Sequence, residues 1–155
     1  MSGEKDMLME WVRLAKMDLS MGKHLFELHR PMPIEGICFH AQQAGEKILK
    51  YFLSTKGIEP PKTHDLQILI EMCLEFDESF NTLSKESILL SQYGVMPRYP
   101  AEYELEEHDA DLALKYSENI MTFVNKLSFP STEEDTEPEN ETPAVENDES
   151  EDMPC

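Results

Sequence analysis

Apolar residues recur every three or four positions through almost all of residues 1–130, and no segment alternates with a period of two. This spacing is typical of amphipathic helices, whose core-facing side chains return every 3.6 residues. It predicts a first helix over residues 6–29, which Pro31 and Pro33 separate from the next. The core face of this first helix is expected to hold Leu8, Trp11, Val12, Ala15, Leu19, Gly22, Leu25 and Phe26.

The clearest helical stripe begins at Ile34 and continues for five turns to Leu53. Gly57 is expected to end this second helix, because glycine readily adopts the left-handed conformation found after helix ends. The stripe includes small residues that let another helix approach closely. Its members are Ile34, Ile37, Cys38, Ala41, Ala44, Gly45, Ile48, Leu49, Phe52 and Leu53.

A third helix follows Pro60 and Pro61. Thr63 is expected to cap it, with Asp65 in its first turn, where the helix dipole favours a carboxylate. Its buried stripe is expected to contain Leu66, Leu69, Ile70, Cys73 and Leu74.

The rest of residues 1–130 predicts a weaker helix over residues 84–93, a loop over residues 94–100 and a last helix over residues 102–127. Two prolines three positions apart exclude regular helix from the loop. The predicted fold class is all-α, an antiparallel up-and-down bundle of four longer helices and one short one. The buried side of the last helix is expected to hold Leu105, Leu112, Tyr116, Ile120, Phe123 and Leu127.

Residues 131–155 contain eleven Asp or Glu residues and no Lys or Arg, so they cannot bury enough apolar surface to fold. We predict a helical domain over residues 1–130 and a disordered acidic tail. The domain has 13 basic and 21 acidic residues, a net charge of −8 against −19 for the whole chain. This charge disfavours broad nucleic-acid binding, which needs clustered Lys and Arg.

The N-terminal region is charged and amphipathic, which indicates neither a signal peptide nor a membrane span. The three cysteines, Cys38, Cys73 and Cys155, are widely spaced and are expected to be free thiols in a reducing cytoplasm. The sequence has no metal-finger spacing and no Gly-rich phosphate loop, so we expect neither a metal nor a cofactor.

Candidate binding residues lie along one edge of the second helix, where Gln43, Lys47 and Lys50 follow His40 at intervals of three or four. Glu46 and Lys50 form an i,i+4 pair. One interpretation is a solvated helix flank with one ion pair. The alternative is a strip where amides and lysines bind an anionic group such as a phosphate.

Three other positions are candidates. Lys62 and His64 stand at a helix start, where a phosphate binds well, although His64 could simply stiffen the corner. Arg98 and Tyr99 lie in the predicted loop and could bind a nucleotide or close the end of the bundle. His108, on the apolar side of the last helix, is expected to be a core or interface residue more often than a catalyst.

Four separated motifs occur in the order found in one family. They are Trp11 with Ala15-Lys16-Met17-Asp18-Leu19, then Cys38-Phe39-His40-Ala41-Gln42-Gln43-Ala44-Gly45-Glu46-Lys47-Ile48-Leu49-Lys50, then Pro60-Pro61-Lys62-Thr63-His64-Asp65-Leu66, and finally Arg98-Tyr99-Pro100. Over residues 7–127 the chain resembles the HEPN (higher eukaryote and prokaryote nucleotide-binding) domain in its small, stand-alone prokaryotic form. The resemblance implies a helical bundle that commonly dimerises and is often paired with a minimal nucleotidyltransferase in toxin–antitoxin or related two-component systems.

Several branches of that family are metal-independent ribonucleases whose signature is an Arg followed, after four to six residues, by a His. This chain departs from the signature, because nine residues separate Arg98 from His108. The leading hypothesis is therefore a homodimeric HEPN protein, without strong catalytic activity, that binds a nucleotidyltransferase, a nucleotide or both. The alternatives are a ribonuclease that uses Arg98 with His108 or His64, and a purely structural helical oligomer.

Overall fold

The predicted apolar stripes face one another in the computed structural model, which describes residues 2–93 and 104–129. Three α-helices are long: α1 (Ser2–Leu28), α2 (Ile34–Thr55) and α5 (Glu107–Ser128). Two are short, α3 (Leu66–Leu74) and α4 (Ser84–Tyr93), and a 3-10 segment, η1 (Glu78–Leu83), joins them. The all-α prediction is confirmed, with three long helices and two short ones where four longer helices and one short one were expected.

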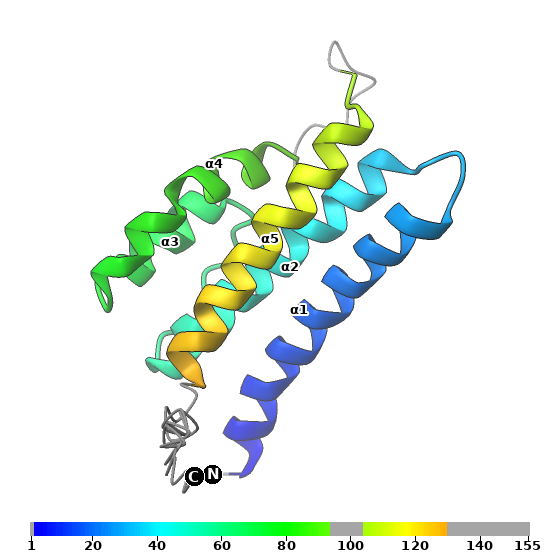
Figure 1. The fold of residues 1–155 in the computed structure, drawn as a ribbon. Helices are drawn as coiled ribbons and strands as arrows, with labels where there is room; N and C mark the ends of the chain where they lie inside the picture. Colours follow the sequence, from blue (N-terminus) through cyan, green and yellow to red (C-terminus); the bar gives the residue numbers. More distant parts are fainter. Residues whose placement is uncertain (1, 94–103, 130–155) are drawn as a thin grey trace, which may run out of the picture.

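α2 is the central helix, and it packs against α1, α3, α4 and α5 (Figure 1). Its predicted stripe is confirmed, since most of these side chains are fully buried. Gly45 marks the point where three other helices meet it. A Cβ added there would lie 3.4 Å from Leu66 of α3 and 3.6 Å from both Leu90 of α4 and Ile120 of α5. The small residues of the stripe therefore permit close packing, as the sequence indicated.

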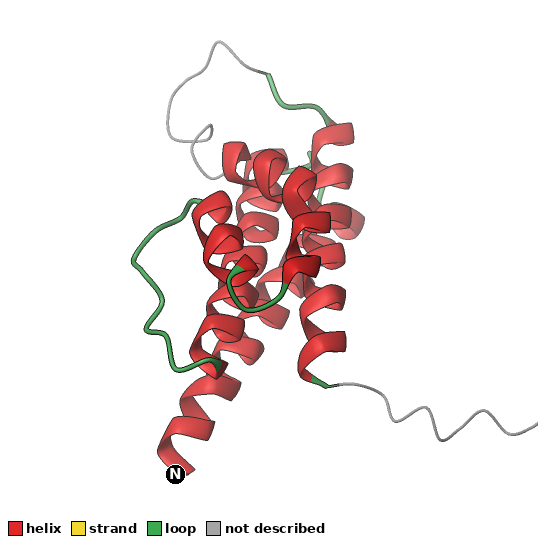
Figure 2. Cartoon of the chain, turned by 90° about the vertical axis from the view of Figure 1, so that its left-hand side faces the viewer, coloured by secondary structure: helices red, strands yellow, loops and turns green. Residues whose placement is uncertain are grey.

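The chain does not reverse direction at every connection. α1 and α2 are antiparallel, and α3, α4 and α5 alternate, as predicted (Figure 1). Residues 56–65, however, run back alongside α2 as an extended connection, which Figure 2 shows as a long green loop. As a result α2, α3 and α5 all run in the same direction. Pro60 and Pro61 cannot continue a helix, which accounts for the extended course.

An aromatic cluster holds the α3–α4 hairpin against the bundle. Phe80 of η1 is fully buried. Its ring centroid lies 4.6 Å from that of Phe52 on α2 and 4.9 Å from that of Phe123 on α5. The sequence pattern did not predict η1, because a six-residue 3-10 segment is too short to show a helical period.

Helix α5 differs from its prediction in start and in buried face. Residues 104–106 are not helical, because Glu106 and Asp109 form a capping box in which the Glu106 N–H donates to Asp109 Oδ2 over 2.8 Å. Of the predicted buried positions, Ile120 is fully buried, Leu105, Tyr116 and Phe123 are partly buried against the core, and Leu127 is exposed. The observed buried face also includes small residues, which let α2 approach closely; its members are Ala110, Ala113, Leu114, Ser117, Ile120, Met121 and Val124.

The cap of α3 was assigned to the wrong residue. Asp65, not Thr63, is the N-cap, and its side chain accepts a hydrogen bond of 2.9 Å from the Gln67 N–H. Thr63 Oγ1 instead accepts from the Asp65 N–H over 3.1 Å and so supports the cap. Gly57 has a φ of 75° just after α2, as predicted.

The predicted loop over residues 94–100 and the predicted tail over residues 131–155 lie outside the described residues. Within the described part of the chain, none of the helices is long and apolar enough to cross a membrane.

Candidate functional site

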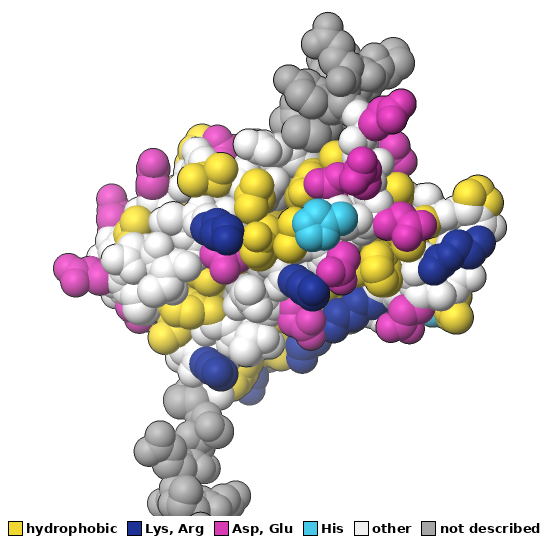
Figure 3. Space-filling model, turned by 45° about the horizontal axis from the view of Figure 1, so that its top comes forward, with side chains coloured by type: hydrophobic (Ala, Val, Ile, Leu, Met, Phe, Trp, Pro, Cys, Tyr) yellow, Lys and Arg dark blue, Asp and Glu magenta, His cyan; other side chains and the backbone are white. Residues whose placement is uncertain are grey.

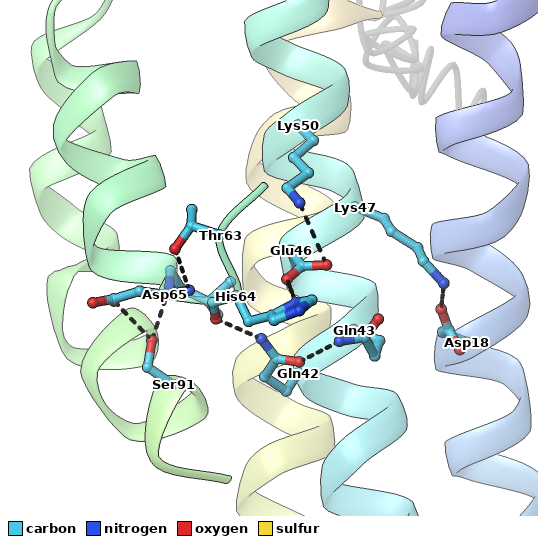
Figure 4. Close-up of polar contacts among 11 residues, drawn as sticks. Asp18, Gln42, Gln43, Glu46, Lys47, Lys50, Thr63, His64, Asp65 and Ser91 are labelled. Atoms are coloured by element: carbon cyan, nitrogen blue, oxygen red, sulfur yellow. Dashed lines mark hydrogen bonds and ion pairs between the residues drawn. The ribbon is translucent and has the colours of Figure 1, made fainter. Parts of the chain in front are cut away.

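The candidate strip on α2 is mostly a set of buried ion pairs and hydrogen bonds, which contradicts its interpretation as a solvated flank (Figure 4). Asp18 of α1 is 5 % exposed. Its carboxylate accepts a hydrogen bond from Lys47 and lies 2.9 Å, Oδ1 to Nδ1, from His40. These contacts join α1 to the middle of α2. The sequence analysis missed Asp18, since nothing in the pattern showed which residue of another helix would face Lys47.

Glu46 is the second carboxylate of this set. Its Oε1 lies 2.6 Å from His64 Nδ1. Its Oε2 forms the predicted pair with Lys50 Nζ at 3.7 Å. Both members of that pair are at least nine-tenths buried, whereas the side chain of His64 is 65 % exposed. His64 therefore covers a buried carboxylate from the solvent side.

Two glutamines complete the set. Gln42, fully buried, donates through Nε2 to the His64 carbonyl over 2.8 Å. Gln43 Nε2 donates to Gln42 Oε1 over 2.8 Å. Together with Glu46 they fasten the connection before α3 to the side of α2. We refer to all eight residues as the polar network: Asp18, His40, Gln42, Gln43, Glu46, Lys47, Lys50 and His64.

The polar network satisfies its own charges. Two lysines, Lys47 and Lys50, pair with two carboxylates, Asp18 and Glu46. A phosphate bound to these lysines would have to separate ion pairs that are largely shielded from water, which is costly. This geometry favours a structural role, and anion binding by the strip stays a prediction.

The other predicted site residues are not brought together by the described structure. Lys62 is exposed on the connection after α2. His108, expected in the core or at an interface, is exposed in the first turn of α5. It is surrounded in sequence by acidic residues, which disfavour an approaching phosphate: Glu104, Glu106, Glu107 and Asp109. Arg98 and Tyr99 lie outside the described residues, so the pairing of Arg98 with His108 or His64 stays a prediction.

The two buried cysteines, Cys38 and Cys73, are expected to stay protonated at neutral pH. Burial raises the pKa of the Cys38 thiol to about 12, with smaller contributions from Asp109 and Glu35, and burial raises the pKa of Cys73 to about 12. Residues 2–93 and 104–129 hold no group of three or more His, Cys, Asp or Glu side chains placed to bind a metal ion.

On the face shown in Figure 3, Lys and Arg side chains are interspersed with Asp and Glu.

A second candidate surface is a solvent-exposed side of α1. At 3.6 residues per turn, its five apolar residues fall within about 80° of the helix circumference. Four of them are 42–71 % exposed, and Leu14 is half-buried. The sequence carries this signal as a seven-residue spacing, but we assigned α1 a single face and overlooked a second one. We call this surface the outer stripe: Met7, Leu14, Met17, Met21 and Leu28.

Comparison with known proteins places this architecture in a family. A family model, the HEPN domain, matches residues 8–127, about three quarters of the chain. The chain belongs to the HEPN family. The crystal structure of an archaeal HEPN homologue superposes with a TM-score of 0.59 at 21 % identity, covering 77 % of this chain and 96 % of that one. No curated protein sequence matches this one.

The HEPN assignment confirms the resemblance found in the sequence. The matched region includes all residues of the polar network and every residue of the outer stripe except Met7. At 21 % identity the archaeal structure supports the HEPN fold and carries no residue roles over to this chain.

Proposed function

We propose that this HEPN protein acts by association, as a homodimer whose two copies pack through the outer stripe of α1. The observation that carries the proposal is the arrangement of the stripe, which is nearly symmetric about its middle residue. A surface that is symmetric in this way is complementary to a second copy of itself across a two-fold axis.

Met17 stands at the centre of the outer stripe. Leu14 and Met21 lie three residues before and four residues after it, and Met7 and Leu28 lie ten before and eleven after. When two copies of α1 run antiparallel with the two-fold axis near Met17, Leu14 meets Met21 and Met7 meets Leu28. All five apolar side chains of each copy then lose contact with water, which is the main driving force for association.

Two polar residues beside the outer stripe fit nearly the same arrangement. Glu10 and His24 lie seven residues to either side of Met17, one position out of register with the apolar pairs, so each Glu10 lies near the His24 of the second copy. The Glu10 carboxylate accepts a hydrogen bond of 2.9 Å from Arg13 Nε, which lowers the pKa of this carboxyl. An ionised carboxylate opposite an imidazole adds an attractive contact at each end of the interface.

Disulfide cross-linking tests this geometry. In a Cys155→Ser background, Met17→Cys is expected to form a covalent dimer under mild oxidation, because helices packed on an axis near Met17 bring its two Cα atoms within disulfide range. Met9→Cys is the matched control. Met9 lies on the same helix and is 43 % exposed against 42 % for Met17, but it is outside the stripe. Equal cross-linking of the two variants, or none of Met17→Cys, would contradict the proposed interface.

Membership of the HEPN family extends the proposal to a second partner, a minimal nucleotidyltransferase in a toxin–antitoxin or related two-component system. We expect a nucleotidyltransferase encoded beside this protein to co-elute with it in size-exclusion chromatography after co-expression. A nucleotidyltransferase taken from an unrelated pair serves as the control and is expected to elute alone. If the neighbouring enzyme also elutes alone, the two-component part of the proposal fails while the homodimer remains open to its own test.

A further inference from the structure

A cavity of about 600 Å³ lies between the start of α1, the last turns of α2 and the connection that follows α2. Its walls include the apolar side chains of Leu8, Trp11, Ile58 and Pro60. A volume of this size and a largely apolar lining are typical of sites for small organic molecules. The polar network ends at this cavity, through Lys50.

Lys50 gives the cavity one buried positive charge. Its side chain is 9 % exposed and forms part of the cavity wall. Among the described residues, the acceptor found for its ammonium group is Glu46 Oε2 at 3.7 Å, an ion-pair distance longer than a hydrogen bond. Glu46 is also engaged by His64 through its other oxygen. The Lys50 ammonium group therefore retains hydrogen-bonding capacity inside an apolar site, where a further acceptor is strongly favoured.

The remaining charges of the lining restrict the ligand. Lys62 contributes a second positive charge, and it is exposed, while Glu4 and Glu59 contribute two negative charges. With two acidic side chains in the lining, a polyphosphate would meet repulsion that a single negative charge placed at Lys50 largely avoids. The cavity thus fits one anionic group at its polar end and an apolar body over the rest.

We propose that this cavity is a binding site for a small organic acid with one carboxylate and an aromatic or aliphatic body. The carboxylate binds the remaining donors of the Lys50 ammonium group while Lys50 stays paired with Glu46, and the apolar body packs against Trp11, Ile58 and Pro60. The site shares Met7 with the outer stripe, but Lys50, Trp11 and the connection after α2, which carry the proposal, are not part of the stripe.

Phenylbutyrate and its uncharged amide, phenylbutyramide, form a matched pair of probes. Trp11 is the single tryptophan of the chain, so its fluorescence reports directly on the cavity, and calorimetry provides a second readout. We expect phenylbutyrate to bind with about millimolar affinity or better and to bind at least about tenfold more tightly than the amide, because the carboxylate gains a charge-assisted hydrogen bond. Absence of binding in both readouts, or equal affinities of acid and amide for the unmodified protein, would overturn the proposal.

Two variants locate the charge that is responsible. Lys50→Met is expected to remove the preference for the acid while leaving amide binding intact, whereas Lys62→Met, at an exposed lysine, is expected to preserve the preference. If Lys50→Met does not fold, Lys50→Arg replaces it and is expected to keep the preference. The proposed site would be contradicted if folded Lys50→Met kept its preference for the acid, or if Lys62→Met or Lys50→Arg lost that preference. Tighter binding of ATP than of phenylbutyrate, measured by Trp11 fluorescence, would also contradict it.

Discussion

Phe80→Ala is expected to lower the free energy of unfolding by about 3–5 kcal/mol, the usual cost of removing a fully buried aromatic ring. Phe80 has no exposed surface and packs between the rings of Phe52 and Phe123. Alanine would leave a cavity where η1 meets α2 and α5. The change is measured by urea denaturation at a fixed protein concentration, since self-association would make stability depend on concentration.

Phe76→Ala is the matched control. Phe76 also follows α3, but it is 43 % exposed. Its replacement is expected to cost less than about 1 kcal/mol, in the range usual for surface substitutions. If the two variants were equally stable, η1 would not anchor the α3–α4 hairpin as described.

Asp18→Ala is expected to destabilise the protein by about 2–4 kcal/mol, because it removes the carboxylate that pairs with Lys47 and His40. Both partner side chains are 20 % exposed, so water compensates them incompletely. In the double variant Asp18→Ala/Lys47→Met the unpaired charge is gone, and part of the lost stability should return. Urea denaturation of both variants measures the difference.

An exposed pair between helices provides the comparison for Asp18. Lys23 of α1 and Glu118 of α5 lie 2.7 Å apart, with side chains 42 % and 50 % exposed. Glu118→Gln is expected to cost about 1 kcal/mol or less, as exposed ion pairs usually do. A similarly small effect of Asp18→Ala would show that the polar network does not hold α1 against α2.

The spacing of apolar residues predicted the helices correctly where one continuous apolar face determines which residues are buried. The stripe from Ile34 to Leu53 identified α2 and its start correctly. Because other helices surround α2, its apolar positions recur at helical spacing over the whole length of the helix. The face of α5 was only partly right: Ile120 is buried and Phe123 packs against the core as predicted, but close packing also buries Ala110 and Ala113, which the prediction omitted in favour of large residues such as Leu112. Burial of a small residue depends on the approach of a neighbouring helix, which the sequence of α5 alone does not specify.

The candidate site was harder to predict for a related reason. The residues on the edge of α2 were identified, but their partners come from distant segments: Asp18 precedes Lys47 by 29 positions, and His64 follows Glu46 by 18. The spacing of charges within one helix indicates only a surface strip. In the folded protein, residues from other segments pair with these side chains and largely shield them from water. The outer stripe shows the opposite case, because its seven-residue spacing was present in the sequence and was overlooked beside the stronger core face of α1.

The molar mass in solution, measured by light scattering during size-exclusion chromatography, tests the proposed dimer most directly. We expect the unmodified protein to have twice the 17.9 kDa mass of one chain. Met21→Glu, which places a charge in the outer stripe, should give the mass of one chain. Met9→Glu should remain dimeric, since Met9 is as exposed as Met21, 43 % in both cases, but lies outside the stripe. A monomeric unmodified protein, or a Met21→Glu variant as dimeric as Met9→Glu, would contradict association through α1.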